Sequence, residues 1–140
     1  MEIHVIDMTG EQPKESTIKV PKLPEWSMAK AIGYKPKTTF WDDFCIAELY
    51  GDPSPIHGIL DTYRRAFKEW RGNVEYITEL SLVLNHRGCF WYNAAERNED
   101  NKDCFTALYS SYFNLWHMLN DWACENLNGD DYAYYRQITD

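Results

Sequence analysis

The chain has 140 residues, of which 44% are hydrophobic and 16% aromatic, enough for one folded domain with a single core. Its net charge of −8 argues against direct binding to nucleic acid phosphates or anionic membranes, which requires clustered Lys and Arg. Residues 1–37 hold six basic and five acidic side chains, whereas residues 38–140 hold eight basic and seventeen acidic ones. The acidic excess therefore belongs to the second part of the chain.

Four cysteines are scattered along the chain without a CxxC pair, and no secretory leader precedes them. We therefore expect reduced thiols and a cytoplasmic protein. No apolar run reaches the roughly 20 residues of a membrane span. Membrane insertion is accordingly not expected.

The N-terminal part has the pattern of a β-hairpin arm. Residues 3–8 and 17–20 read as two short strands around the turn-rich residues 9–13. Prolines at 21 and 24 hold the following segment extended, because proline fixes φ and restricts the residue before it. We predict an arm and linker over residues 1–37.

Helix signals begin at Thr39. Thr39 and Asp42 have the spacing of a capping box, which predicts a helix over residues 40–50 that ends at Gly51. Ser54 followed by proline then begins a second helix, whose apolar side chains recur at three- and four-residue steps as far as Gly72.

Asn73 has the character of an N-cap for a third helix, in which Gly88 predicts a kink or a close helix crossing. The polar residues 96–103 predict a loop or joint before a fourth helix, which ends near residue 127. A final turn covers residues 130–137. The predicted fold is mainly α: an antiparallel four-helix bundle-like body over residues 38–140 with the β-hairpin arm in front.

Two pairs have the spacing of metal ligands on one helix face: His86 with Cys89, and His117 with Asp121. Structural zinc sites normally combine two tight pairs, and buried cysteine is common for packing reasons alone. No Glu stands three residues before a histidine, which argues against a di-iron carboxylate site. We predict no metal, no cofactor and no catalytic residue, and the sequence leaves open whether these pairs ever meet.

The basic residues between 64 and 71 alternate with aromatic ones, as in some nucleic acid sites, but they fall on a helix whose aromatic stripe is expected to be buried. Ion pairs within the acidic body are the better interpretation.

Aromatic side chains stand beside carboxylates at two places. Trp41 precedes Asp42 and Asp43. In the final turn, the acids Asp130 and Asp131 adjoin Tyr132 and Tyr135. Aromatic anchors with a polar rim are typical of protein-binding surfaces, so we predict that these seven residues contact a partner.

Several segments between residues 38 and 140 carry a further signal: Thr39-Phe40-Trp41-Asp42-Asp43-Phe44, Asp61-Thr62-Tyr63, Ala66-Phe67, Glu69-Trp70, Tyr76-Ile77-Thr78-Glu79-Leu80, Val83-Leu84-Asn85 and Cys124-Glu125-Asn126-Leu127. Over about residues 38–140, these segments resemble a family of small acidic proteins carried by phages, prophages and conjugative elements of gut Firmicutes. The chain departs from the family pattern at residues 51–57 and at Gly88-Cys89. The resemblance implies an accessory gene of a mobile element that acts in a bacterial cytoplasm, and it implies no catalytic activity.

These observations favour a non-enzymatic protein that binds and inhibits a host or defence protein, by analogy with antirestriction and anti-CRISPR proteins. The alternative is a small enzyme, or a small-molecule or nucleotide-binding protein with a pocket in the bundle, assisted by a metal. A homo-oligomer that packs its aromatic side chains between protomers is a third possibility.

Overall fold

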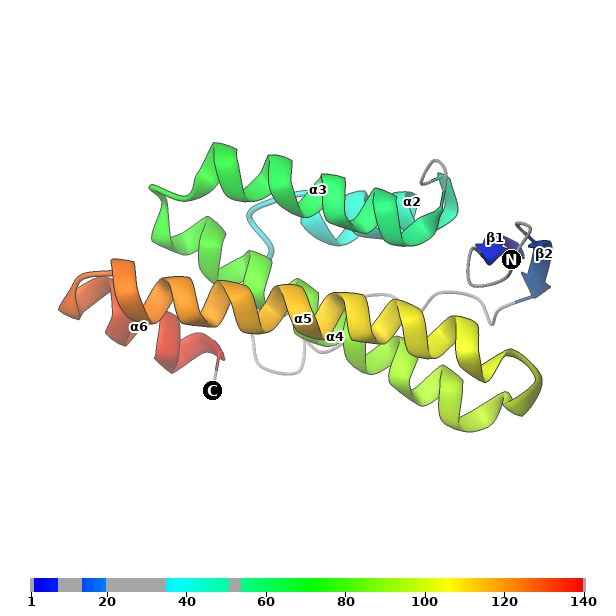
Figure 1. The fold of residues 1–140 in the computed structure, drawn as a ribbon. Coiled ribbons are helices and arrows are strands. Elements are labelled where there is room, and N and C mark those ends of the chain that lie inside the picture. Colours follow the sequence, from blue (N-terminus) through cyan, green and yellow to red (C-terminus); the bar gives the residue numbers. More distant parts are fainter. Residues whose placement is uncertain (1, 8–13, 20–34, 51–53, 140) are drawn as a thin grey trace.

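The computed structural model describes residues 2–7, 14–19, 35–50 and 54–139, and it confirms that the chain is mainly helical (Figure 1). Five α-helices lie in these residues: α2 (Phe40–Tyr50), α3 (Pro55–Trp70), α4 (Val74–Arg97), α5 (Lys102–Asn126) and α6 (Gly129–Thr139). One turn of 3-10 helix, η1 (Glu99–Asn101), joins α4 to α5.

Two N-caps form as predicted. The Ser54 side chain accepts a hydrogen bond from the His57 backbone N–H at 3.4 Å, and the Asn73 side chain accepts one from the Tyr76 N–H at 3.2 Å. The first helix differs, because the Thr39 hydroxyl donates to Asp43 Oδ2 at 2.9 Å, one residue beyond the predicted capping-box partner. The acidic first turn still lies at the positive end of the helix dipole.

The C-terminal segment forms a full helix instead of the predicted final turn. Asn128 accepts a hydrogen bond from the Asp131 N–H through its side-chain oxygen at 2.9 Å, and α6 then continues for 11 residues. Sequence reasoning underestimated this helix because its apolar stripe is short and consists mostly of tyrosine.

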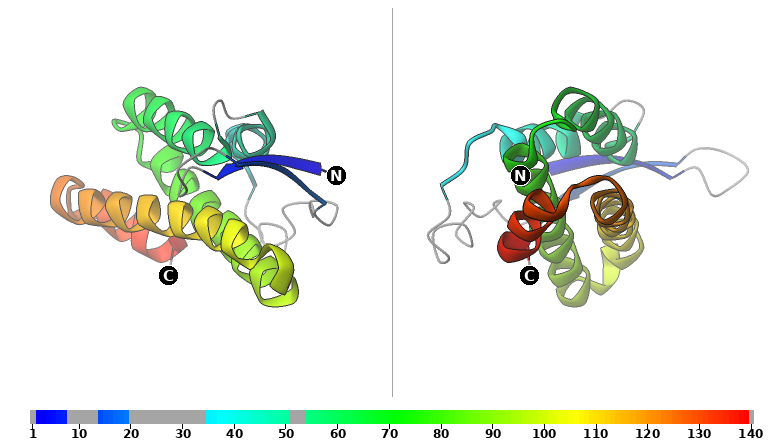
Figure 2. Two further views of the ribbon diagram at one scale, coloured as in Figure 1. Left: turned by 45° about the vertical axis from the view of Figure 1, so that its right-hand side comes forward. Right: turned by 90° about the vertical axis from the view of Figure 1, so that its left-hand side faces the viewer.

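The helices form a bundle with α2 and α3 on one side and the antiparallel pair α4–α5 on the other (Figures 1 and 2). Figure 1 shows α6 folded back along α4 and α5. Apolar side chains from all five helices fill one core, including Phe44, Ile59, Leu80, Trp91, Tyr112 and Leu119. None of the described helices is long and apolar enough to cross a membrane.

Gly88 lies where α4 and α5 approach closely. A Cβ atom at this position would lie 2.7 Å from Cε1 of Phe113, which is closer than real Cβ contacts. Helix α4 nevertheless runs without a break from Val74 to Arg97. The structure thus has the close helix crossing that the sequence suggested and not the kink.

At the N-terminus, the backbone of β1 (Glu2–Asp7) pairs with β2 (Lys14–Lys19) in an antiparallel register that places Glu2 opposite Lys19. The predicted turn at residues 9–13 and most of the predicted linker lie outside the described residues. The arm's relation to the body stays a prediction.

Candidate functional site

A charged cluster lies in the core, between the two sides of the bundle. Glu48 of α2 and Arg87 of α4 both have 0% of their surface exposed. Arg87 Nε donates to Glu48 Oε1 at 2.8 Å, and Arg87 Nη2 donates to the other carboxylate oxygen. The buried Tyr112 hydroxyl of α5 also donates to Glu48. Three helices are therefore joined through one carboxylate.

Aromatic rings surround the Arg87 guanidinium. Its central carbon lies 4.9 Å from the ring centre of Trp41, 4.7 Å from Phe90 and 5.9 Å from Trp91. Burial by itself lowers the pKa of Arg87. The adjacent Glu48 carboxylate raises this pKa by a larger amount, so the net shift is upward. Trp41, which we predicted as a partner contact, is thus partly buried against this cluster.

The cluster is a structural element, because its charged groups are closed to solvent and to any substrate. Burial also raises the pKa of Tyr112 well above its usual value and that of the neighbouring Cys45 thiol to about 11. Neither group is an activated nucleophile. Among the described residues, Arg87 Nη1 and Trp91 Nε1 are buried without a hydrogen-bond partner. Such buried donors are uncommon in folded proteins, and each of them lowers the stability of the fold.

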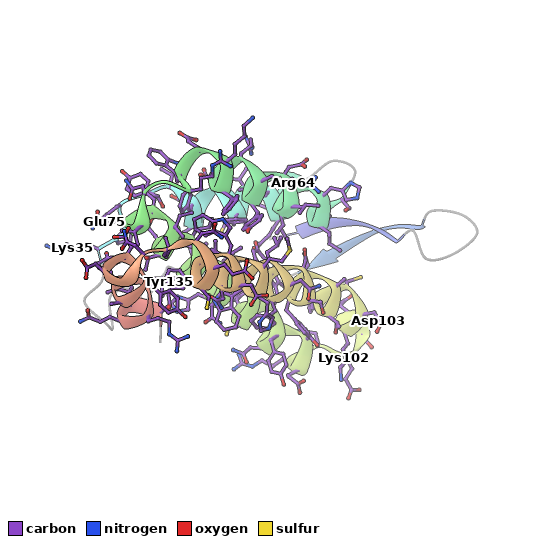
Figure 3. The ribbon with its side chains drawn as sticks, turned by 60° about the vertical axis from the view of Figure 1, so that its left-hand side comes forward. Lys35, Arg64, Glu75, Lys102, Asp103 and Tyr135 are labelled. Atoms are coloured by element: carbon purple, nitrogen blue, oxygen red, sulfur yellow. The ribbon has the colours of Figure 1, made fainter. Side chains whose placement is uncertain are left out.

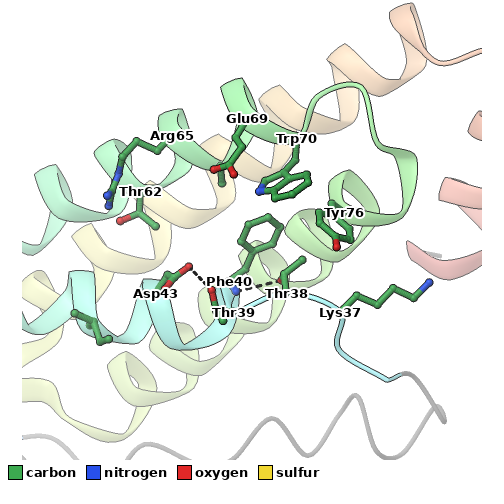
Figure 4. A pocket seen from close by; sticks show the side chains of 12 residues that line it. Lys37, Thr38, Thr39, Phe40, Asp43, Thr62, Arg65, Glu69, Trp70 and Tyr76 are labelled. Atoms are coloured by element: carbon green, nitrogen blue, oxygen red, sulfur yellow. Dashed lines mark hydrogen bonds between the residues drawn. The ribbon is translucent and has the colours of Figure 1, made fainter.

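Of the predicted partner-binding residues, Asp43 lines a groove in the surface. An open groove of about 510 Å³ runs between the start of α2 and the second half of α3 (Figure 4). Its lining combines two carboxylates and two basic side chains with hydroxyls and aromatic rings, including Asp43, Glu69, Lys37, Arg65, Thr39, Thr62, Trp70 and Tyr76. The Trp70 and Tyr76 rings lie 4.2 Å apart between centres and form one wall.

A second buried carboxylate positions the floor of this groove. Glu79 of α4 accepts hydrogen bonds from the Lys37 backbone N–H at 2.6 Å and from the Thr38 hydroxyl. The Lys37 ammonium forms an ion pair with Glu75 Oε2 at 2.8 Å, and this hydrogen bond raises the pKa of Lys37. These contacts hold residues 35–39 against α4. They thereby fix the position of the start of α2, where Asp43 lines the groove.

The predicted residues of α6 have different environments. Asp130 is exposed, whereas Asp131 and Tyr132 are half-buried. Asp131 also lines a second open groove of about 490 Å³, beside Arg71 and Trp122.

Tyr135 is only 2% exposed, so we correct its predicted place on the surface. Its side chain points from α6 into the body (Figure 3). There its hydroxyl forms hydrogen bonds with Ser81 Oγ, at 2.9 Å, and with Asn120 Oδ1, which accepts. Burial raises the pKa of Tyr135 to about 12. Sequence reasoning missed this role because the other tyrosines of the same helix are half-buried.

The two acidic groups do not form one surface. Figures 1 and 2 show α2 and α6 in separate parts of the molecule. The structure therefore places Asp43 at the first groove and Asp131 at the second, while Asp42 is exposed at the start of α2.

The two pairs with metal-ligand spacing, His86 with Cys89 and His117 with Asp121, are not joined by a third ligand in the part of the chain that the structure describes. His86 is half-buried on α4, where burial lowers its pKa, and the Cys89 sulfur lies 4.0 Å from Asn85 Oδ1. His117 is exposed on α5 with its ring 5.1 Å from that of Trp116. Within the described ranges, no three side chains of His, Cys, Asp or Glu are grouped so that they could hold a metal.

The buried charges Glu48 and Arg87 were not found from the sequence, although a signal existed. Glu48 continues the apolar spacing of Phe40 and Phe44, and Arg87 stands between Leu84 and Trp91. A charged residue at a core position of an amphipathic helix predicts a buried partner of opposite charge.

Comparison with known protein families, curated proteins and solved structures finds no match to this chain.

Proposed function

We propose that this chain is a non-enzymatic accessory protein of a mobile element, acting in the cytoplasm of a bacterial host. It binds, and thereby inhibits, a host or defence protein through an acidic surface with aromatic walls. The observation that supports the proposal most directly is that Asp43, singled out by its sequence context, lines an open groove beside Trp70 and Tyr76.

The groove suits a polar segment of a protein. Asp43 and Glu69 are exposed carboxylates that attract basic side chains, and Asp42 adds a third exposed carboxylate at the start of α2. The Trp70 ring supplies flat apolar area at low entropic cost. A partner loop that presents Lys or Arg beside an apolar residue would satisfy both features.

The test is capture of a partner from host lysate on the immobilised chain, at increasing ionic strength. We expect the captured protein to be lost when Asp42→Lys and Asp43→Lys are combined, and also in Trp70→Ala. The matched control reverses two exposed acids far from the groove, Asp100→Lys with Asp103→Lys, and should leave capture unchanged. Equal loss in both double variants would contradict the proposal.

The alternative is a small molecule in the same groove, which has a volume typical of ligand sites. Thermal denaturation with a panel of nucleotides and elemental analysis of the purified protein test it. A nucleotide that raises the melting temperature of the native chain but not of Trp70→Ala would favour this alternative. A stoichiometric metal would favour its metal-assisted form.

A further inference from the structure

The groove between α2 and α3 contains charges of both signs. Asp43 and Glu69 are its carboxylates, and Lys37 and Arg65 are its basic groups. The Lys37 ammonium already pairs with Glu75 at 2.8 Å, and Glu75 does not line the groove. Arg65 is therefore the basic group of this lining whose charge is not yet compensated.

Arg65 and Glu69 lie one helical turn apart on α3, and both side chains are exposed. Within the part of the chain that the structure describes, neither of them forms an ion pair. A basic residue one turn before an acidic one is the less favourable order for an ion pair along a helix. Both charges are thus available to a ligand in the groove.

These groups have a definite order along the groove. Figure 4 shows Arg65, Glu69 and Trp70 in succession along α3, with Asp43 on the opposite side, on α2. The rings of Trp70 and Tyr76, with centres 4.2 Å apart, form the aromatic wall beyond Glu69. The positive group therefore lies toward one end of the groove and the aromatic wall toward the other.

The spacing along α3 matches that of an extended peptide. Two side chains four residues apart in a helix, such as Arg65 and Glu69, are separated by about 6 Å along its axis. Alternate side chains of an extended chain point to the same side and are separated by about 6–7 Å. An acid and a base two residues apart in an extended segment can therefore meet Arg65 and Glu69 together.

The open form of the groove favours such a segment over a small molecule. Sites for small molecules normally enclose most of the surface of their ligand. A protein segment continues beyond both ends of the groove and does not need this enclosure. A segment with Lys and Arg alone would bring positive charge beside Arg65, which opposes its binding.

We infer that the partner segment in this groove is extended and carries both charges: an acid that pairs with Arg65 and, two residues away, a base that pairs with Glu69 and Asp43. An apolar residue next to the base packs on Trp70. The inference rests on the function proposed above, and it adds Arg65 as a residue that determines which segments bind.

The probe is a phage-displayed library of random linear peptides, selected on the immobilised full chain. Sequences that also bind Trp70→Ala are discarded, because they do not depend on the groove. We expect the remaining sequences to be enriched in an acid and a base two residues apart. Selection on Arg65→Glu should retain the base and lose the acid, because this variant replaces the positive charge of Arg65 with a further carboxylate.

Fluorescence anisotropy with the most enriched peptide, labelled with fluorescein, measures each contact. We expect Arg65→Glu and Glu69→Lys each to weaken binding about tenfold. The matched controls are Arg64→Glu on α3 and Asp103→Lys on α5, which change exposed residues that line neither of the two described grooves. They should leave binding unchanged. Replacing the acid of the peptide with Lys should weaken its binding to the native chain but not to Arg65→Glu.

Enriched sequences that carry bases alone would overturn the inference, and so would a peptide that Arg65→Glu and Arg64→Glu affect equally. Recovery of no peptide that depends on Trp70 would also overturn it. A dimer in analytical ultracentrifugation that Arg65→Glu dissociates would do the same, because it would assign the groove to a second copy. Capture of a host protein that is lost in the combined Asp42→Lys and Asp43→Lys variant but unaffected by Arg65→Glu would overturn this inference alone and leave the proposed function standing.

Discussion

Glu48→Ala should be among the most destabilising single changes in the body. It removes the carboxylate that Arg87 contacts through two hydrogen bonds, at a site where both residues are 0% exposed. Losing one partner of a buried ion pair costs about 3–5 kcal/mol, because the other charge remains buried without compensation. The Tyr112 hydroxyl would also lose its acceptor, which adds about 1 kcal/mol.

Such a loss is large against the roughly 5–15 kcal/mol that stabilises a typical domain. For a chain of this length, each kcal/mol lowers the melting temperature by about 3 °C, so the combined loss should lower it by roughly 12–18 °C. Urea unfolding followed by tryptophan fluorescence measures the free energy directly. The change should appear in the transition midpoint and leave the slope unchanged.

The double variant Glu48→Met with Arg87→Met tests the cause. Both charges are then replaced by apolar side chains of similar length, and this type of exchange is often neutral or stabilising. We expect it to be several kcal/mol more stable than Glu48→Ala, an order of magnitude taken from such exchanges. A loss below about 1 kcal/mol in Glu48→Ala, or a double variant no more stable than Glu48→Ala, would refute the reasoning.

Three further predictions concern other sites. Gly88→Ala should cost about 1–3 kcal/mol in thermal unfolding, because its Cβ would meet an aromatic ring at 2.7 Å, whereas Gly72→Ala, with nothing within 4 Å, should change stability little. The pKa of Tyr135 is raised from 10.0 to about 12 on folding, so its neutral form stabilises the fold below pH 10, and roughly 2–3 kcal/mol is lost as pH rises from 10 to 12. Tyr135→Phe should lack that part of the alkaline loss, and an unchanged pH profile would contradict the assignment. Cys45, half-buried with its pKa raised to about 11, should react with a thiol reagent near pH 8 more slowly than the exposed Cys124, as peptide mass spectrometry would show; equal rates would contradict this.

Local patterns in the sequence were sufficient to predict most of the helices. The Ser54 and Asn73 caps, the stop at Gly72 and the three- and four-residue apolar spacing act within one turn of the chain, and α3 and α4 form as these signals predict. Gly88 predicted the close crossing, because a residue without a side chain permits two helices to approach.

Tertiary structure decided which side chains of similar type are buried and which are exposed. Asp43 and Glu48 are acids of the same helix, yet one lines an open groove and the other is fully buried against Arg87, 39 residues away in the sequence. Tyr135 lies in the core while Tyr132, one turn earlier, remains half-buried. The close approach of Gly88 to Phe113 likewise exists only once α4 and α5 pack side by side. Capping and periodicity are local properties of the chain, whereas burial and ion pairing depend on which helices meet.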